Sequence, residues 1–298
     1  MKRVIVIAGV TASGKSSLAV SLAQKINGEI ISADSVAVYK ELNIGSAKPT
    51  VEEQDGIIHH LIDIVSITES YHVARFQKEA RDAIDLILSK GKTPIIVGGT
   101  GLYINALLND YRFNEELELP EIDESLTNEA LMQELIELDP VTAENIHINN
   151  RKRLIRSLQM VKGMKLPKSD VNENKGKNRL YDAHVYFLQG DRTKLYERIN
   201  KRVDIMMSQG LLDEVSELKT EYPDLFSFQS MQSIGYREFN DYFQGNSSID
   251  EVQELIKTNT RRLAKRQITW FKHQTESIWI DVFNEDPLEF VLNNIEKW

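Results

Sequence analysis

The residues whose types and spacing point most clearly to chemistry form the octapeptide Gly9–Ser16, which reads GVTASGKS. It fits the pattern G-x-x-x-x-G-K-[ST], in which backbone N–H groups turn inward, a lysine supplies positive charge and a serine hydroxyl can ligate magnesium. Together these groups make a receptor for a polyphosphate. The loop by itself leaves open which phosphate compound binds and whether a phosphoryl group moves. The expected ligand contacts are Gly9, Thr11, Ala12, Ser13, Gly14, Lys15 and Ser16.

Two elements must position this loop, and the sequence predicts both of them. Residues 4–8 are a β-branched apolar run typical of a buried strand, and apolar residues recur at helical spacing from Leu18 to Ile26. A strand, a glycine-bounded loop and a helix are the setting that the motif requires. The start of the helix also directs the positive end of its dipole toward the ligand.

Polar residues follow two further predicted strands. Asp34 and Ser35 come directly after residues 29–33, and Thr100 lies in a glycine-rich turn after residues 94–97. Because ligands bind at the carboxyl ends of parallel strands, we expect these side chains near the phosphate loop. Asp34 could accept a proton or hold magnesium through water, or it could simply cap a turn. Thr100 could donate to an oxygen, or its turn could be purely architectural.

The remaining pattern predicts an α/β fold, with a parallel sheet flanked by helices and a helical insertion. Residues 1–112 and 181–298 are expected to form the core, and residues 113–180 the insertion or lid. The insertion opens with an acidic run within 115–124, continues with two helical patterns and ends in a basic loop at 168–179.

Composition restricts the possible functions further. The chain has 36 basic and 45 acidic residues, a net charge of −9, and no cysteine. The lack of cysteine excludes disulfides, thiolate zinc sites and a cysteine nucleophile. No apolar run approaches the roughly 20 residues of a membrane span. We therefore expect a cytoplasmic protein without membrane contact.

Basic residues nevertheless gather in three places. One is the predicted helix around residues 151–161, a second follows the strand predicted at residues 182–188 and includes Arg202, and the third is residues 257–273. Solvated helix faces would explain most of these charges. Clusters on an acidic protein also favour a partner rich in phosphate, and an arginine beside a phosphate loop can clamp the phosphates.

Taken in order, the chain resembles the tRNA dimethylallyltransferases, also called tRNA isopentenyltransferases, in their bacterial form. The resemblance spans nearly the whole length, and its ordered motifs are far more specific than the phosphate loop alone. The motifs are GVTASGKSS, DSVAVYKELNIGSAKP, HHLIDI, PIIVGGTGLYI, DPVTAENIHINNRKRLIRSL, SIGYREF and TRRLAKRQITWF. The family's P-loop kinase-like core with a helical insertion agrees with the expected fold.

The resemblance implies alkyl transfer rather than phosphoryl transfer. Dimethylallyl diphosphate would bind in the loop with Mg²⁺ on Ser16. The exocyclic amine of the adenosine 3′-adjacent to the anticodon of a tRNA would attack the allylic carbon and expel pyrophosphate. Asp34 would accept the amine proton, while Thr100 and Arg202 would contact the diphosphate. These three residues are the expected catalytic residues.

The resemblance also implies a protein that acts as a monomer on the anticodon stem-loop of tRNA. The target adenine would be flipped into a channel beside the segment after the second strand, and the basic regions would hold the RNA. The expected tRNA contacts are Asp34, Ser35, Val36, Ala37, Lys152, Arg153, Arg156, Gly235, Tyr236, Arg237, Arg262, Lys265 and Arg266.

The chain departs from the family pattern at four positions in its amino-terminal part. The family usually has proline where Val10 stands and often glutamine where Ala37 stands. It commonly has aspartate where Asn43 stands and threonine where Ser46 stands. Ala37 and Asn43 remove polar or charged groups near the expected substrate, whereas Ser46 keeps its hydroxyl.

Two other enzymes would also use the phosphate loop. An adenine-nucleotide prenyltransferase is disfavoured by the basic clusters, because a free nucleotide needs no such surface. A small-molecule P-loop kinase would show ATP-dependent phosphorylation without prenyl transfer. The joint presence of Lys15, Ser16, Asp34, Thr100 and Arg202 also disfavours an RNA-binding module without catalysis.

Overall fold

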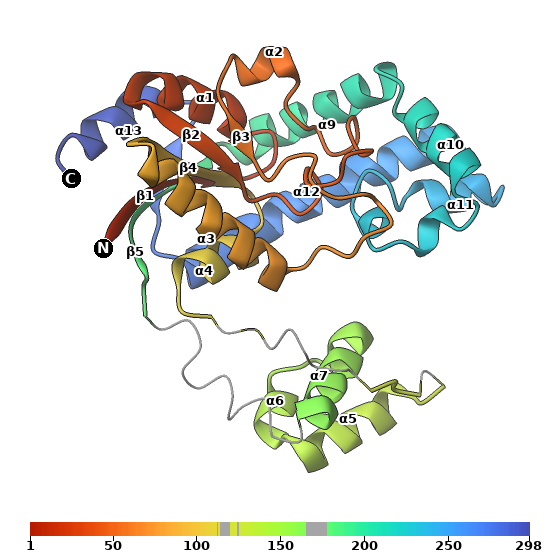
Figure 1. Ribbon diagram of the computed structural model, residues 1–298. Helices are drawn as coiled ribbons and strands as arrows, with labels where there is room; N and C mark the ends of the chain where they lie inside the picture. Colours follow the sequence, from red (N-terminus) through yellow and green to blue (C-terminus); the bar gives the residue numbers. More distant parts are fainter. Residues whose placement is uncertain (112, 114–119, 124, 165–177) are drawn as a thin grey trace. The chain divides into compact units, whose positions relative to one another are not determined.

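A computed structural model of the chain describes residues 1–298 except 112, 114–119, 124 and 165–177 (Figure 1). The chain divides into two compact units. One consists of Met1–Leu108 and Leu180–Trp298, and the other of Asn109–Arg179. Most of the acidic run and of the basic loop expected in the insertion lies outside the described residues.

The larger unit is built on a six-stranded sheet with the order β3-β2-β4-β1-β5-β6, in which the paired strands are parallel. The strands are β1 (Lys2–Gly9), β2 (Gly28–Ser32), β3 (His59–His60), β4 (Thr93–Gly98), β5 (Tyr181–Gln189) and β6 (Ile278–Asp281). The predicted α/β fold with a parallel sheet is confirmed. Because all carboxyl ends lie at one edge, the loops after β1, β2 and β4 meet there.

Helices cover both faces of this sheet, as parallel crossovers require (Figure 1). In β1, Val4 and Val6 join the core on one face, whereas Ile5 and Ile7 join the core on the other. This alternation follows from the two-residue period of a strand. The second face is covered by α1 (Lys15–Ile26) and α13 (Pro287–Ile295), and the first by α3 (Val73–Ser89), α4 (Gly101–Leu108) and α12 (Ile249–Gln274).

The remaining helices of this unit extend beyond the sheet. α9 packs against both α10 and α12, so the long α12 links this extension to the sheet. The elements are α2 (Val51–Gln54), α9 (Arg192–Ser208), α10 (Leu211–Glu221), η1 (Leu225–Ser227), η2 (Ser230–Gln232) and α11 (Phe239–Phe243). Within the described ranges, none of the helices combines the length and apolar character that crossing a bilayer requires.

The smaller unit is helical and has a core of its own. Leu131 and Leu135 on one helix pack with Leu154 and Leu158 on another, and all four are fully buried. Its described helices are α5 (Asn128–Leu138), α6 (Pro140–Glu144) and α7 (Arg151–Met164). The exposed side of α7 carries three of the basic residues singled out in the sequence, namely Lys152, Arg153 and Arg156.

Candidate functional site

The phosphate loop joins β1 to α1 at the carboxyl edge of the sheet. β1 ends at Gly9, where an added Cβ would lie 2.6 Å from the carbonyl oxygen of Leu188 on β5, so the close approach requires glycine. The loop enters α1 at Lys15, whose Nζ donates to the carbonyl oxygen of Val10 at 2.7 Å. The first N–H groups of a helix have no acceptor within the helix, so those of α1 are available to an anion.

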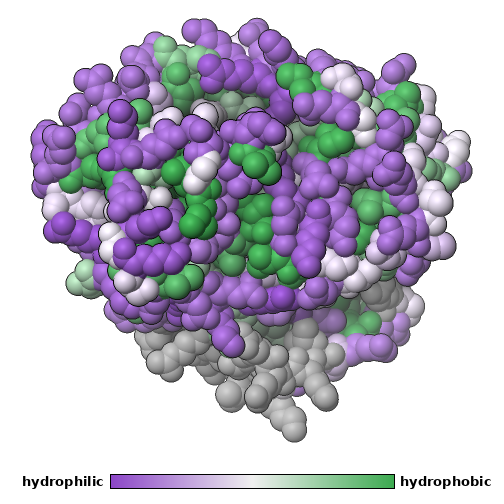
Figure 2. All heavy atoms as spheres, turned by 45° about the horizontal axis from the view of Figure 1, so that its top comes forward, coloured by the Kyte–Doolittle hydropathy of each residue, from purple (hydrophilic) through white to green (hydrophobic). Residues whose placement is uncertain are grey.

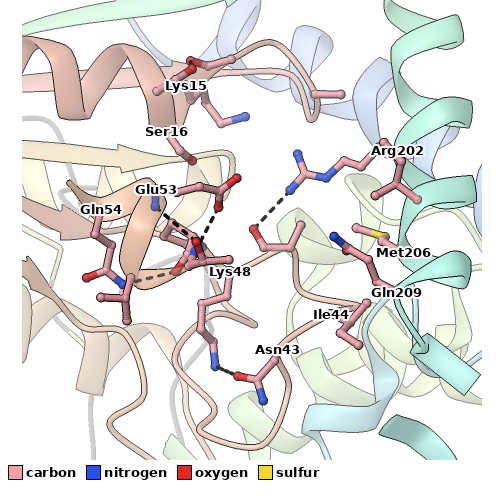
Figure 3. A pocket seen from close by; sticks show the side chains of 18 of the residues that line it. Lys15, Ser16, Asn43, Ile44, Lys48, Glu53, Gln54, Arg202, Met206 and Gln209 are labelled. Atoms are coloured by element: carbon pink, nitrogen blue, oxygen red, sulfur yellow. Dashed lines mark hydrogen bonds between the residues drawn. The ribbon is translucent and has the colours of Figure 1, made fainter. Parts of the chain in front are cut away.

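Two adjoining cavities open against this loop. The outer one has a volume of about 880 Å³ and the inner one about 100 Å³, and Lys15, Ser16 and Arg202 line both. Figure 3 shows Lys15 from α1 and Arg202 from α9 reaching into the outer cavity from two sides. Asp34 and Ala37 complete the inner cavity. The structure therefore brings the start of α1, the turn after β2 and α9 together around these cavities.

α2 contributes to the wall of the outer cavity through Val51, which is 80% exposed. Seen from the side of α2, the surface is mostly hydrophilic, with apolar groups between the hydrophilic ones (Figure 2). Ile205 and Met206 on α9 add apolar surface to the cavity wall. The cavity thus combines charged groups at the loop with apolar groups farther out.

Two of the cations that line the cavities, Lys15 and Arg202, are poorly solvated. Burial lowers the pKa of Lys15 to about 7, the neighbouring Arg202 acts in the same direction, and the Asp34 carboxylate opposes both. Burial likewise lowers the pKa of Arg202, again opposed by Asp34. A bound anion would replace the missing solvation and favour the charged form of Lys15. The electrostatics therefore fit an anionic ligand.

The two carboxylate oxygens of Asp34 have different surroundings. Oδ1 accepts the N–H groups of Val36 at 2.8 Å and Ala37 at 3.3 Å, which caps the turn after β2. Oδ2 accepts no hydrogen bond from the described residues, and the side chain lines the inner cavity. The turn-capping interpretation is therefore correct for one oxygen, while the second is left for a ligand.

Other residues of the predicted site lie at or beyond the edges of the cavities. Thr11 lines the inner cavity and Ala12 and Gly14 the outer one, whereas neither Thr100 nor Ser13 lines either. The Thr100 carbonyl oxygen accepts the N–H groups of Tyr103 at 3.0 Å and Ile104 at 3.2 Å in the first turn of α4. Ser13 is 3% exposed, and its Oγ has no hydrogen-bond partner among the described residues.

The wall of the outer cavity at residues 43–49 depends on Lys48. Its Nζ donates to the carbonyl oxygen of Tyr39 at 2.8 Å and to Oδ1 of Asn43 at 3.0 Å, and it pairs with Asp63. With its side chain only 6% exposed, Lys48 stabilises this segment rather than offering a free charge.

Two of the four departures from the family pattern make hydrogen bonds in this segment. Asn43 accepts from Lys48, and Ser46 Oγ donates to the Leu42 carbonyl oxygen at 2.7 Å. The other two are buried, and Ala37 leaves its position in the inner cavity without a polar group.

Glu214 on α10 also stabilises the segment at residues 43–49. Its carboxylate accepts the N–H groups of Asn43 at 3.0 Å and Ile44 at 2.8 Å, and the hydroxyl of Tyr236 at 2.8 Å. The Tyr236 oxygen also accepts the N–H of Ser46 at 3.2 Å. No sequence signal separates Glu214 from a solvated helical glutamate, because the backbone N–H groups that it accepts lie about 170 residues away.

This arrangement gives the side chain of Tyr236, one of the expected tRNA contacts, partners inside the protein. Its side chain is fully buried and its pKa is raised by burial and by Glu214, so its hydroxyl serves the cavity wall. Gly235 is buried as well, and only Arg237 is exposed, where it pairs with Glu238 at 3.1 Å. On α12, by contrast, the side chains of Arg262, Lys265 and Arg266 are all exposed.

Gln267 on α12 is a second residue that the sequence interpretation missed. Its Oε1 accepts the N–H of Thr11 in the phosphate loop at 3.0 Å. A signal was present, because Gln267 shares a helix face with Ala264 and Phe271, which belong to the core. A polar side chain on a buried face needs a hydrogen-bond partner, so this position should have been considered.

The described residues around the cavities are compatible with a metal ion that is shared with water and a ligand. Among the described residues, no group of three or more His, Cys, Asp or Glu could bind a metal ion. Mg²⁺ commonly takes one or two protein oxygens and completes its shell with water and substrate phosphates. The exposed hydroxyl of Ser16 beside the phosphate loop fits that arrangement.

Comparison with known proteins gives consistent matches. A family model described as IPP transferase matches residues 37–274. A tRNA dimethylallyltransferase from Acetivibrio thermocellus is 45% identical over 100% of this chain and 97% of its own, and one from Bacillus anthracis is 44% identical over 99% and 96%. The crystal structure of a tRNA delta(2)-isopentenylpyrophosphate transferase from Staphylococcus epidermidis matches with a TM-score of 0.76 and 38% identity, covering 100% of this chain and 99% of that one. A eukaryotic dimethylallyltransferase acting on tRNA matches with a TM-score of 0.85 and 30% identity, covering 100% and 80%.

Proposed function

The chain belongs to the IPP transferase family, and we propose that it transfers a dimethylallyl group from dimethylallyl diphosphate to tRNA. The acceptor is the exocyclic amine of the adenosine 3′-adjacent to the anticodon, and pyrophosphate is released. The observation that carries the proposal is the meeting of the phosphate loop, Arg202 and Asp34 around two adjoining cavities.

The charges of the site suit the departure of pyrophosphate. As the bond between the allylic carbon and the diphosphate oxygen breaks, negative charge grows on the leaving group. Lys15, Arg202 and the N–H groups at the start of α1 are fixed where they can stabilise that charge. Mg²⁺, which we propose is held by Ser16 and the diphosphate, would supply further neutralisation. Thr100 is proposed to contact the same group from the β4 turn.

Asp34 is proposed to accept the proton that the amine loses as its new bond to carbon forms. The bond between nitrogen and carbon forms, the bond between carbon and oxygen breaks, and the proton passes to the carboxylate. Oδ2 is suited to this role because Oδ1 is engaged in the turn. A general base of this kind contributes roughly 10²–10⁴-fold to rate.

The exposed cations are proposed to hold the RNA. Arg262, Lys265 and Arg266 on α12 and the basic residues of α7 offer charge to the phosphate backbone. We further propose that the protein acts as a monomer, since residues of one chain build the whole cradle, and that it acts in the cytoplasm, where tRNA is modified.

The decisive experiment supplies purified protein with labelled dimethylallyl diphosphate, Mg²⁺ and one of three acceptors. These are an unmodified tRNA with adenosine 3′ of the anticodon, the same tRNA with guanosine there, and AMP. Label on the first tRNA alone supports the proposal. Label on AMP would indicate an adenine-nucleotide prenyltransferase, and ATP consumption without prenyl transfer would indicate a kinase.

A charge-reversal experiment tests the α12 surface. The double substitution Arg262→Glu with Arg266→Glu should weaken tRNA binding and flatten its salt dependence, because each lost phosphate contact reduces the salt slope by about one. Binding isotherms at several salt concentrations measure both effects. A matched reversal of Arg192 and Arg198, exposed on α9, controls for net charge. Equal behaviour of the two variants would contradict an RNA contact on α12.

A conservative substitution tests whether Tyr236 supports the cavity wall or contacts tRNA. Tyr236→Phe removes the hydroxyl that joins Glu214 to the N–H of Ser46, so the cavity wall should loosen. We expect the KM for dimethylallyl diphosphate to rise several-fold, the order of one lost hydrogen bond, with the Kd for tRNA unchanged. Steady-state kinetics and a tRNA binding assay separate the two. A selective loss of tRNA affinity would restore the original expectation.

A further inference from the structure

Gln267 connects the two glycine-rich turns at the carboxyl edge of the sheet. Its Oε1 accepts the N–H of Thr11 at 3.0 Å, and its Nε2 donates to the carbonyl oxygen of Gly99 at 3.1 Å. The orientation of the amide is dictated by these partners, since one is a donor and the other an acceptor. The side chain is 8% exposed, so both bonds are shielded from water.

The Gln267 amide occupies the space where a side chain on Gly99 would begin. A Cβ added to Gly99 would lie 2.2 Å from Nε2 of Gln267 and 3.5 Å from the carbonyl oxygen of Gly9. The β4 turn, the end of β1 and α12 therefore meet at the Gln267 amide. A side chain of another length or polarity could not make both hydrogen bonds.

We propose that Gln267 is a positioning residue, which fixes the phosphate loop against the β4 turn so that the diphosphate meets a preformed cradle. The proposal rests on the proposed function, because it assigns the cradle to dimethylallyl diphosphate. Gln267 lines neither cavity, so it acts through the backbone of Thr11 and Gly99. Fixing charged groups in advance is what makes them effective in binding and catalysis.

The hydrogen bond to Gln267 affects how Thr11 can contact the diphosphate. Its N–H is committed to Gln267, so we expect the diphosphate to take its backbone hydrogen bonds from the residues that lead into α1. Without Gln267 the Thr11 N–H would lose this acceptor, and we expect the loop to adopt several conformations.

The first test replaces Gln267 with methionine, which has a similar length and no hydrogen-bonding amide. We expect the KM for dimethylallyl diphosphate and the Kd for inorganic pyrophosphate to rise about tenfold, the order of a lost buried hydrogen bond, while the Kd for tRNA stays within twofold. Gln274→Met, at the exposed end of the same helix, is the matched control and should behave like wild type. Unchanged pyrophosphate affinity in Gln267→Met would overturn the proposal.

The second test uses Gln267→Glu and measures the pH dependence of pyrophosphate binding. If Gln267 only filled space, this pH dependence would not differ between the variant and wild type. An ionised carboxylate can accept from Thr11 but cannot donate to Gly99, whereas the protonated acid can do both. The ratio of pyrophosphate Kd values, variant over wild type, should therefore fall toward one as the pH is lowered through the pKa of the new carboxyl group. A ratio independent of pH would overturn the proposal.

Gly99→Ala gives an independent check, because its Cβ would displace the Gln267 amide. It should weaken pyrophosphate binding in wild type and have a much smaller effect in a Gln267→Ala background. Equal effects in both backgrounds would show that Gly99 acts without Gln267. If wild-type protein bound pyrophosphate but modified no tRNA, the proposed function would fail, while the comparison among Gln267 variants would still decide the positioning role.

Discussion

Asp34→Asn is expected to lower the rate of prenyl transfer by about 10²–10⁴-fold, the range lost with a general base. The substitution is chosen because an asparagine Oδ1 can still accept the N–H groups of Val36 and Ala37, so the turn after β2 should survive. Only the capacity to take a proton is removed. Single-turnover transfer to tRNA at saturating dimethylallyl diphosphate measures the effect without interference from product release.

Two comparisons distinguish the role of Asp34 as a general base from its role in capping the turn after β2. Asp34→Ala removes both, so it should be no more active than Asp34→Asn and less stable to heat. Asp85→Asn, on the exposed part of α3, changes the net charge equally and should leave the rate unchanged. The Kd for tRNA should remain within a few-fold in all three variants. Near-normal transfer by Asp34→Asn would remove Asp34 from the role of base.

Lys15→Met is expected to lower kcat/KM for dimethylallyl diphosphate by about 10²–10³-fold, as removal of one preorganised donor to a developing anion does. The methionine preserves much of the side-chain length but lacks the ammonium group. That group reaches the outer cavity from the phosphate loop and faces Arg202 (Figure 3). An effect below fivefold would mean that Arg202 and the backbone carry the diphosphate without Lys15.

The lowered pKa of Lys15 adds a pH dependence with a definite sign. In the free protein burial brings this pKa to about 7, so the ammonium is present below pH 7 and is lost as the pH rises above it. An anion binds the protonated form better, so pyrophosphate affinity should fall above pH 7, by at most about tenfold per pH unit for one proton. Calorimetry in buffers of different ionisation enthalpy should detect proton uptake on binding. Lys15→Met should lose that uptake, and its persistence would assign the proton to another group.

The features of this protein that could be predicted from the sequence are those that depend on neighbouring residues along the chain. The phosphate loop follows from Gly9, Lys15 and the strand and helix that flank it, because neighbours along the chain set its backbone geometry. The continuous apolar run at residues 4–8 predicts a buried strand, and that strand is β1. The ordered motifs then predicted the family, and comparison with known proteins confirms it.

Only the tertiary structure decided which of several similar side chains serve the site. The basic residues of α9 look alike in sequence, yet Arg202 alone among them lines the cavities, because the others lie on exposed faces of the helix. Tyr236 lies in a turn that reads as a surface loop, but it is buried on Glu214. Gln267 contacts Thr11, although the two residues are 256 positions apart in the chain. Such contacts depend on how distant segments pack against each other, and the spacing of residues along the sequence does not predict this packing.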